Sequence, residues 1–310
     1  MSKLLNVSSS PHVRCGVSTK NLMYDVAIAM LPATIWGVMQ FGIYSLIVVV
    51  ATVLSCVLSE YLFETLMHKP VTISDGSALV TGMILGLNMP PAIPLWMPIL
   101  GGVFAIIVVK QLYGGLGQNW MNPALAARCF MLISFAQAMT KFTDPVTDAV
   151  ASATPLAAIK AGDTYDLAAM FIGKIPGTIG EVSVIALLIG AAYLLVKKVI
   201  TIRIPAAYIL SFAVFAFIFG QHNINYVLAE VCGGGLIFGA FFMATDYVTS
   251  PISAKGQVIF AVGCGLLTSF IRVYGGYPEG VSYSILIMNL AVPLIDRYTR
   301  PRIFGEVKAK

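Results

Sequence analysis

Long apolar stretches separated by short polar segments are the feature that most restricts the fold of this chain. Eight stretches approach the roughly 20 apolar residues that an α-helix needs to cross a bilayer. They are Leu22–Phe41, Ile43–Leu66, Leu95–Tyr113, Pro123–Met139, Val182–Val196, Ile204–Gly220, Val258–Tyr274 and Val281–Ile295. Two shorter stretches interrupted by glycine, Ala78–Met89 and Val231–Ala244, are interpreted as half-helices or thin spans. The sequence therefore predicts an all-α polytopic membrane protein with ten transmembrane segments, two of them short and broken.

The composition agrees with this interpretation. Charged residues make up 11% of the chain, against roughly 25% in a soluble domain, and the mean hydropathy is +0.87. The first 21 residues are polar and contain no apolar run, so we expect neither a cleaved signal peptide nor a lipidation motif.

The distribution of basic residues predicts the orientation, because cytoplasmic loops collect Lys and Arg. With the N-terminus inside, most of the 19 basic residues fall on the cytoplasmic side. Only Lys141, Lys160, Lys174 and Arg272 fall outside, and Arg128 lies within a span. Both termini are thus predicted to be cytoplasmic, in a bacterial cytoplasmic membrane. The net charge of +5 reflects this topology and contact with anionic lipid headgroups, not binding to nucleic acid.

Two short motifs recur in the same order and indicate an internal repeat. Gly82–Gly86 in the third span matches Gly235–Gly239 in the eighth, and Tyr113-Gly-Gly matches Tyr274-Gly-Gly. The offset is five spans, an odd number, so the second copy must cross the membrane in the opposite sense. The predicted parts are a cytoplasmic N-terminal arm (1–21), a first five-helix repeat (22–140), an extracytoplasmic loop (141–181), a second five-helix repeat (182–297) and a cytoplasmic tail (298–310).

Ionisable residues within or beside the spans are candidate functional groups, because charge is costly at membrane depth. Asp25, Glu60 and Glu64 lie near the predicted cytoplasmic face, where their side chains could equally extend to the interface. Asp246 follows the broken eighth segment and is the preferred functional carboxylate. The five cysteines and three histidines show no metal-binding spacing, and we predict no metal site.

Six segments distributed along the chain resemble the RnfD/NqrB family of bacterial electron-transfer complexes. They are Ser10-Pro-His12, Asp75-Gly-Ser77, Gly114-Gly-Leu-Gly-Gln-Asn-Trp-Met-Asn-Pro-Ala124, Ala153-Thr-Pro155, Ala244-Thr-Asp246 and Tyr274-Gly-Gly-Tyr-Pro-Glu-Gly280. The short N-terminal arm is closer to the RnfD type, and an NqrB-type subunit of a Na⁺-pumping quinone reductase is the alternative.

The resemblance implies one membrane subunit of a complex that passes electrons between reduced ferredoxin and NAD⁺ and exports Na⁺ or H⁺. Such a subunit is not active alone. It implies as partners the other Rnf subunits, of the A, B, C, E and G types, and especially the second subunit with covalent FMN. It also implies a flavin transferase for maturation.

The resemblance further implies FMN joined through its phosphate to a threonine. The family's motif, roughly Asp-x-x-Ser/Thr-Gly-Ala-Thr, falls on Asp148 to Thr154 and makes Thr154 the acceptor. This sequence has Ala151 for the Ser/Thr and Ser152 for the glycine. A phosphoester needs an exposed hydroxyl, and the 141–181 loop is the one long polar segment that offers it. The residues alone favour another interpretation, in which Thr154 and the following proline merely start a helix.

A second flavin, non-covalent riboflavin, is implied near the paired asparagines Asn119 and Asn122, which fall on the same predicted side as Asp246. An asparagine amide offers both a donor and an acceptor to the polar edge of an isoalloxazine. Asn122 with Pro123 could instead be a helix N-cap and first helical position. We expect Asn122 to do both.

On the opposite face the last loop is predicted to bring Arg272, Tyr277 and Glu279 close to Thr154. The guanidinium could pair with the FMN phosphate while aromatic rings pack on the isoalloxazine; the alternative is an Arg272–Glu279 pair. One flavin near each face would let electrons cross the membrane.

A channel or transporter for a small neutral solute is the competing class, since several such proteins are also built as inverted repeats. Flavin in the purified chain would favour electron transfer, and solute flux through flavin-free liposomes would favour transport. A purely structural subunit is disfavoured by the polar clusters predicted on both faces.

Overall fold

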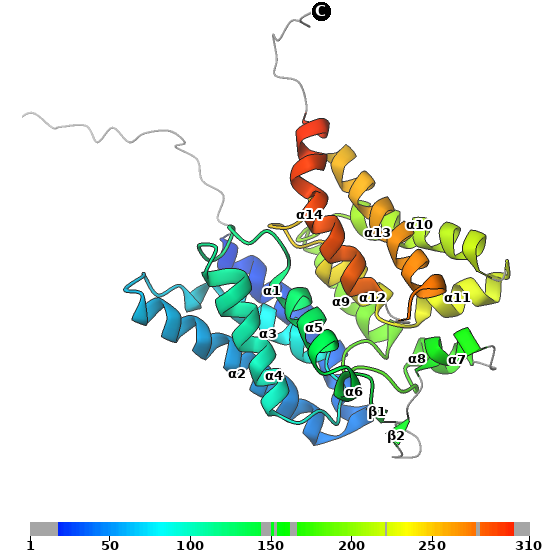
Figure 1. The fold of residues 1–310 in the computed structure, drawn as a ribbon, viewed down its shortest axis with the longest axis horizontal. Helices are drawn as coiled ribbons and strands as arrows, with labels where there is room; N and C mark the ends of the chain where they lie inside the picture. The colour runs from blue at the N-terminus through cyan, green and yellow to red at the C-terminus, as the bar shows by residue number, and fades with distance from the viewer. Residues whose placement is uncertain are drawn as a thin grey trace, which may run out of the picture.

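A computed structural model describes residues 18–143, 150–151, 154–161, 166–220, 222–276 and 280–300. Helices dominate this part of the chain, as predicted (Figure 1). Its only strands are the two-residue β1 (Phe142–Thr143) and β2 (Val150–Ala151), which pair antiparallel. The all-α prediction is therefore confirmed for the described residues.

Each of the ten predicted apolar stretches corresponds to a helix or a run of joined helices. In the first half these are α1 (Thr19–Phe41), α2 (Ile43–Leu66), α3 (Ser77–Leu87), α4 (Trp96–Val103) continued by the π-helix η2 (Phe104–Gln111), and α5 (Pro123–Ser134). In the second they are α9 (Val184–Val196), α10 (Arg203–Phe219), α11 (Ile224–Cys232) followed by α12 (Leu236–Phe238) and the π-helix η3 (Gly239–Met243), α13 (Ala254–Tyr274) and α14 (Val281–Thr299). Short helices fill the connections: η1 (Ile73–Asp75), α6 (Ala136–Met139), α7 (Pro155–Ala161) and α8 (Leu167–Ile172).

By length and apolar character α1, α2 and α13 can each cross a membrane. A fourth span results if α11 and the α12–η3 segment count together despite a bend of 64°. Five shorter apolar helices accompany them: α3, α4–η2, α5, α9 and α10. Many large apolar side chains on these helices are exposed, among them Ile35, Leu54, Leu210 and Phe270. Together these features give the chain the character of a membrane protein.

The two short segments predicted to be broken differ in the structure. The second is bent, because Gly234 and Gly235 take left-handed backbone conformations with φ of 61° and 67° between α11 and α12. The first, α3, is one unbroken helix. Its glycines serve close packing instead, since a Cβ at Gly82 would lie 2.6 Å from the Cα of Val53 in α2.

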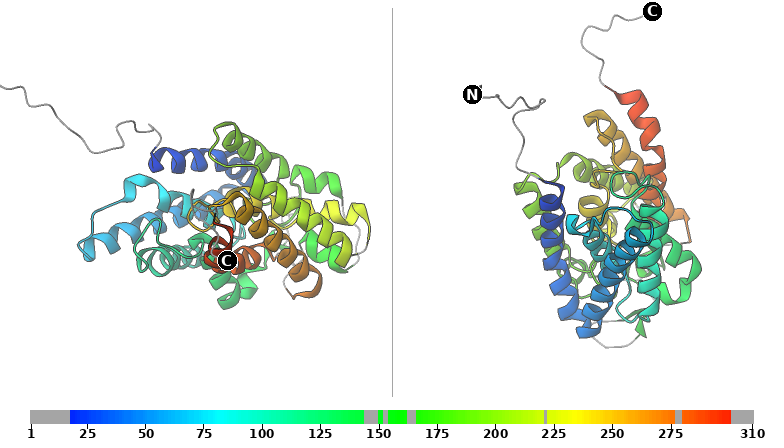
Figure 2. Two further views of the ribbon diagram at one scale, coloured as in Figure 1. Left: turned by 90° about the horizontal axis from the view of Figure 1, so that it is seen from above. Right: turned by 90° about the vertical axis from the view of Figure 1, so that its left-hand side faces the viewer.

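The two halves of the chain pack in corresponding ways. Across their interface α1 packs against α9, and α5 packs against α14. Within the first half α2 packs against α4–η2, and within the second α10 packs against α13. Figure 2 shows the helices of each half gathered on their own side, with α1 beside α9. The short elements α6, α7, α8 and β1–β2 gather at the lower edge of Figure 1, away from the end of α14.

Candidate functional site

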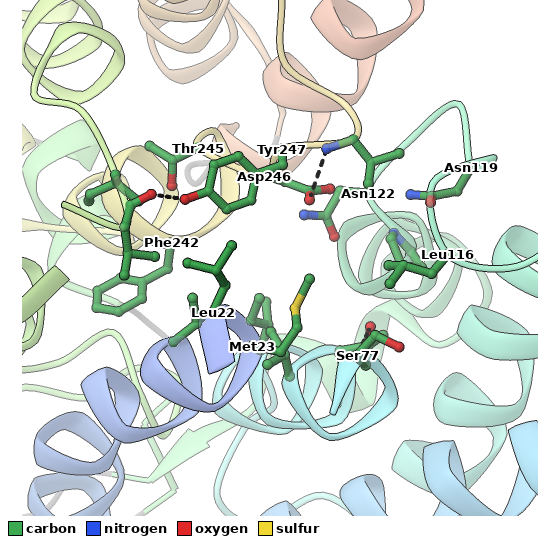
Figure 3. A pocket seen from close by; sticks show the side chains of 18 of the residues that line it. Leu22, Met23, Ser77, Leu116, Asn119, Asn122, Phe242, Thr245, Asp246 and Tyr247 are labelled. Carbon is green, nitrogen blue, oxygen red and sulfur yellow. Dashed lines mark hydrogen bonds between the residues drawn. The ribbon is translucent and has the colours of Figure 1, made fainter. Parts of the chain in front are cut away.

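A pocket lies between the beginnings of α1 and α3, the loop before α5, and the segment after η3 (Figure 3). We call it the amide pocket. It encloses about 780 Å³ including its open mouth. Asn119, Asn122 and Asp246 all line it, so the structure brings together the three residues predicted to hold riboflavin. In Figure 3 they lie opposite Leu22, Met23 and Ser77. The other lining residues are Val26, Val80, Thr81, Ile84, Lys110, Leu116, Pro123, Leu194, Val199, Ile200, Phe241, Phe242, Thr245, Tyr247 and Val248.

Asn122 is the N-cap of α5, with Pro123 at the first helical position, as the sequence pattern indicated. Its Oδ1 accepts hydrogen bonds from the backbone N–H groups of Ala124 at 3.1 Å and Leu125 at 3.3 Å. The cap holds the carboxamide against the pocket. The Asn119 amide nitrogen donates to the Met121 carbonyl at 3.1 Å, which fixes a second amide in the pocket wall.

The Asp246 carboxylate is held by two donors from its own turn. Thr249 Oγ1 donates to Oδ2 at 3.0 Å, and the Val248 N–H donates to Oδ1 at 3.4 Å, the latter drawn in Figure 3. Among the described residues no cation lies within ion-pair distance of this carboxylate. Burial raises the pKa of Asp246 above its usual range, and the two hydrogen bonds oppose that shift.

One pocket residue that the sequence analysis overlooked is Lys110, at the end of η2. Its ammonium donates to Glu60 Oε1 at 2.7 Å and to Ser77 Oγ at 2.6 Å, and only 2% of the lysine side chain is exposed. Gln111 Nε2 donates to Glu60 at 2.8 Å and to Glu64 at 3.2 Å. Glu60 and Glu64 are 0% and 2% exposed, so the suggestion that they extend to the interface is wrong.

Another overlooked residue is Asn289 of α14. In the amide orientation that satisfies both of its side-chain atoms, it donates to the Thr249 carbonyl at 3.1 Å and accepts from the Asn122 N–H at 3.2 Å. Asn289 therefore connects the turn that contains Asp246 with Asn122, the N-cap residue of α5. Its signal in the sequence is a single amide within an apolar stretch.

Thr154 lies just before α7 and caps it weakly, since its Oγ1 accepts from the Ala157 N–H at 3.4 Å. Its side chain is 9% exposed, so the expectation of an exposed hydroxyl is wrong for this arrangement. The cause is packing of α7, whose Leu156 contacts Gly233 and Gly234. Thr154 lines a small cavity, which we call the threonine pocket, of about 320 Å³. Its other lining residues are Pro155, Leu156, Ile175, Pro176, Gly177, Glu181, Val182 and Gly234.

A buried ion pair lies beside the threonine pocket. Arg128 of α5 pairs with Glu181 at 2.6 Å and also donates to the Asn88 side chain at the end of α3. A Cβ at Gly235 would lie 2.4 Å from Glu181 Cδ, so the start of α12 is pressed against this carboxylate. The pair thus connects the end of α3 to the beginning of α12.

Arg272, near the end of α13, is buried and pairs with Glu230 Oε2 at 3.0 Å. It also donates to the carbonyl oxygens of Glu230, Gly233 and Gly234, and its guanidinium lies 4.9 Å from the centre of the Phe212 ring. Since Gly234 also lines the threonine pocket, Arg272 lies next to that pocket. The remaining predicted residues, Asp148, Ser152, Tyr277 and Glu279, lie outside the described residues.

The fold and these sites define a class: a helical membrane protein of two similarly packed halves, with a polar pocket between them and buried ion pairs among its helices, as far as the described residues show. The profile of the NQR2, RnfD, RnfE family matches residues 6–305, and the chain belongs to this family.

The similarity to named relatives covers nearly the full length of the chain. The chain is 50% identical to the D-type subunit of the Na⁺-translocating ferredoxin:NAD⁺ oxidoreductase complex of Acetobacterium woodii, over 99% of this chain and 97% of that protein. It is 44% identical to the D-type subunit of the proton-translocating ferredoxin:NAD⁺ oxidoreductase complex of Clostridium ljungdahlii, over 97% and 96%. It is 34% identical to the D-type subunit of the ion-translocating oxidoreductase complex of Halorhodospira halophila, over 97% and 95%.

Proposed function

We propose that the chain is the D-type membrane subunit of an ion-translocating ferredoxin:NAD⁺ oxidoreductase complex, and that it carries electrons across the membrane on two flavins. The full-length similarity to subunits of that name supports the complex. The observation that carries the role within it is the convergence of Asn119, Asn122 and Asp246 on one pocket. The same relatives favour this assignment over an NqrB-type subunit.

Riboflavin is the ligand proposed for the amide pocket. Two carboxamides, one carboxylate and one ammonium on the wall match the alternating donors and acceptors on the pyrimidine edge of an isoalloxazine. Apolar side chains, among them Leu22, Val80 and Phe242, supply the surface for the rings.

FMN is the proposed covalent group on Thr154. The threonine pocket is much smaller than the amide pocket, and the Thr154 hydroxyl faces the α7 backbone. A flavin transferase must therefore act on an arrangement in which α7 is not packed against Gly233 and Gly234. It acts either before this packing forms or after α7 moves away again. The residues present fit a phosphoester only in that displaced arrangement.

The corresponding packing of the two halves supports the proposed topology of ten spans in a five-plus-five inverted repeat, with both termini in the cytoplasm. In this topology the amide pocket lies toward the cytoplasmic face and the threonine pocket toward the opposite face. The other Rnf subunits are the proposed partners. The relatives are named for Na⁺ in one case and for protons in another, and we propose export of one of these two cations.

The test is intact mass and in-gel fluorescence of the denatured chain, co-expressed with a flavin transferase. We expect an added mass equal to an FMN adduct in the wild type and none in Thr154→Val. Thr140→Val is the control, since Thr140 is an exposed threonine directly after α6 whose hydroxyl donates to the Ala136 carbonyl of that helix. An adduct that persists in Thr154→Val would refute the assignment of Thr154.

A second measurement tests the amide pocket. We expect riboflavin released by denaturing the purified wild-type chain, and clearly less from Asp246→Asn at unchanged yield of protein. A riboflavin content that is the same in both would refute the assignment of Asp246.

A further inference from the structure

The wall of the amide pocket contains one basic side chain among the described residues, Lys110, which is almost completely buried. A buried ammonium is costly unless its charge is balanced and its three N–H donors find acceptors. Glu60 Oε1 and Ser77 Oγ accept two of those donors. No third acceptor for Lys110 is found among the described residues, so one N–H remains for whatever occupies the pocket.

Its partner Glu60 is also incompletely satisfied. Both Lys110 and Gln111 donate to Oε1, whereas Oε2 is buried without a hydrogen-bond partner in the described structure. Such an arrangement is strained electrostatically, because a buried carboxylate oxygen without a donor destabilises the charged form. The hydrogen bonds of Glu60 therefore compensate only part of its buried negative charge.

The backbone around the pocket also departs from regular α-helix at the residues that line it. Lys110 lies at the end of the π-helix η2, and Phe241 and Phe242 lie in the π-helix η3. π-helical turns are rare and are found mostly at functional sites. Both described π-helices thus lead to the same pocket.

We propose that Lys110 is a ligand-binding residue of the amide pocket that selects the reduced, more negative form of its ligand, and that Glu60 limits how strongly it does so. This rests on the proposed function, in which the ligand is a flavin. The ligand class is a planar heteroaromatic with a carbonyl edge that gains electron density on reduction. The third N–H of Lys110 donates to that edge, and the bond strengthens as the edge becomes more negative.

The test measures the affinity of riboflavin for the full-length chain in detergent, once oxidised and once reduced with dithionite under nitrogen. Thr154→Val serves as the background, so that no covalent flavin contributes to the signal. In Lys110→Met we expect affinity for the reduced form to fall at least tenfold more than affinity for the oxidised form. Glu60→Gln shifts the ratio the other way, and Lys110→Arg keeps it near the wild-type value.

Two further variants keep the experiment decisive. If Lys110→Met does not fold, the double variant Glu60→Gln/Lys110→Met removes both charges together and is expected to lower the preference for the reduced form in the same way. Lys69→Met removes an equal charge from an exposed position, where water and salt screen it, and should leave the ratio unchanged.

The outcomes separate this proposal from the one it rests on. No binding of riboflavin to the wild type in either redox state would refute the flavin pocket itself. Normal binding to the wild type, with equal effects of Lys110→Met on both forms, would refute the role of Lys110 and leave the pocket standing.

Discussion

Lys110 and Arg272 are buried cations at similar, though not equivalent, places in the two halves of the molecule, and they bond differently. Each lies near the end of a long helix, just before a Tyr-Gly-Gly sequence, and each bonds to the entry of a short helix, α3 or α12. Lys110 bonds to two side chains, whereas Arg272 bonds to a carboxylate and to three backbone carbonyl groups.

The difference follows from the two side chains. A guanidinium presents a fixed planar set of donors and can donate to several acceptors at once. Arg272 thereby stabilises the bend between α11 and α12. An ammonium on a flexible stem offers three donors in no fixed plane, and Lys110, which lines the amide pocket, uses two of them on Glu60 and Ser77. On this basis we propose that one half uses its buried cation to hold backbone and the other uses it at a ligand site.

The largest expected effect comes from removing the structural cation. Arg272→Met leaves Glu230 buried without its partner and leaves three carbonyl groups without a donor. Breaking a buried pair on one side costs about 3–5 kcal/mol, so we expect a large fall in thermal stability or loss of folded protein. Thermal unfolding of the detergent-solubilised chain measures it.

The matched control is Glu230→Gln/Arg272→Met, which removes both charges and should recover part of the stability. Glu60→Gln/Lys110→Met is its counterpart in the other half. It should lower thermal stability less, because among the described residues it leaves no backbone carbonyl group without its donor. Equal stability for the two double variants would contradict the distinction between the two cations.

An intermediate effect is expected at the two asparagine N-caps, one in each half. Asn122 caps α5 beside the amide pocket, and Asn223 caps α11 away from it. Either substitution to alanine removes a cap and should lower stability by about 1 kcal/mol. Only Asn122→Ala should also lower riboflavin retention. Flavin released on denaturation, measured beside thermal unfolding, separates the two effects, and equal flavin loss in both variants would show that retention merely follows stability.

The sequence predicted the helices well and their contacts poorly. Apolar length located every helix from α1 to α14 that was expected, and the asparagine-proline pair located the start of α5, because both signals are local. Lys110 and Glu60 are 50 positions apart, and Arg272 and Glu230 are 42 apart. Such pairs depend on how helices pack, which periodicity does not encode. For the same reason the burial of Thr154, which lines a cavity with the distant Glu181 and Gly234, was missed.

The smallest effect expected is a pH dependence from Asp246. Here the amide pocket differs again from its counterpart, because Glu181 at the threonine pocket has Arg128 as a cation partner whereas Asp246 has hydrogen bonds alone among the described residues. Burial raises the pKa of Asp246 in the folded protein, so the folded state binds a proton more readily than the unfolded state. Stability from this group is therefore full below the unfolded pKa of about 4 and is lost as the pH rises through the folded value.

Asp246→Asn should remove that dependence, since an amide does not titrate. We expect the melting temperature of the wild type to fall modestly from about pH 4 upward relative to that of the variant. The comparison uses the flavin-free chain, because a ligand bound beside Asp246 would contribute its own dependence on pH. If the melting temperatures of the two proteins change equally with pH, the Asp246 carboxylate is solvated in the empty pocket. The contrast between the hydrogen-bonded Asp246 and the ion-paired Glu181 would then have no consequence for stability.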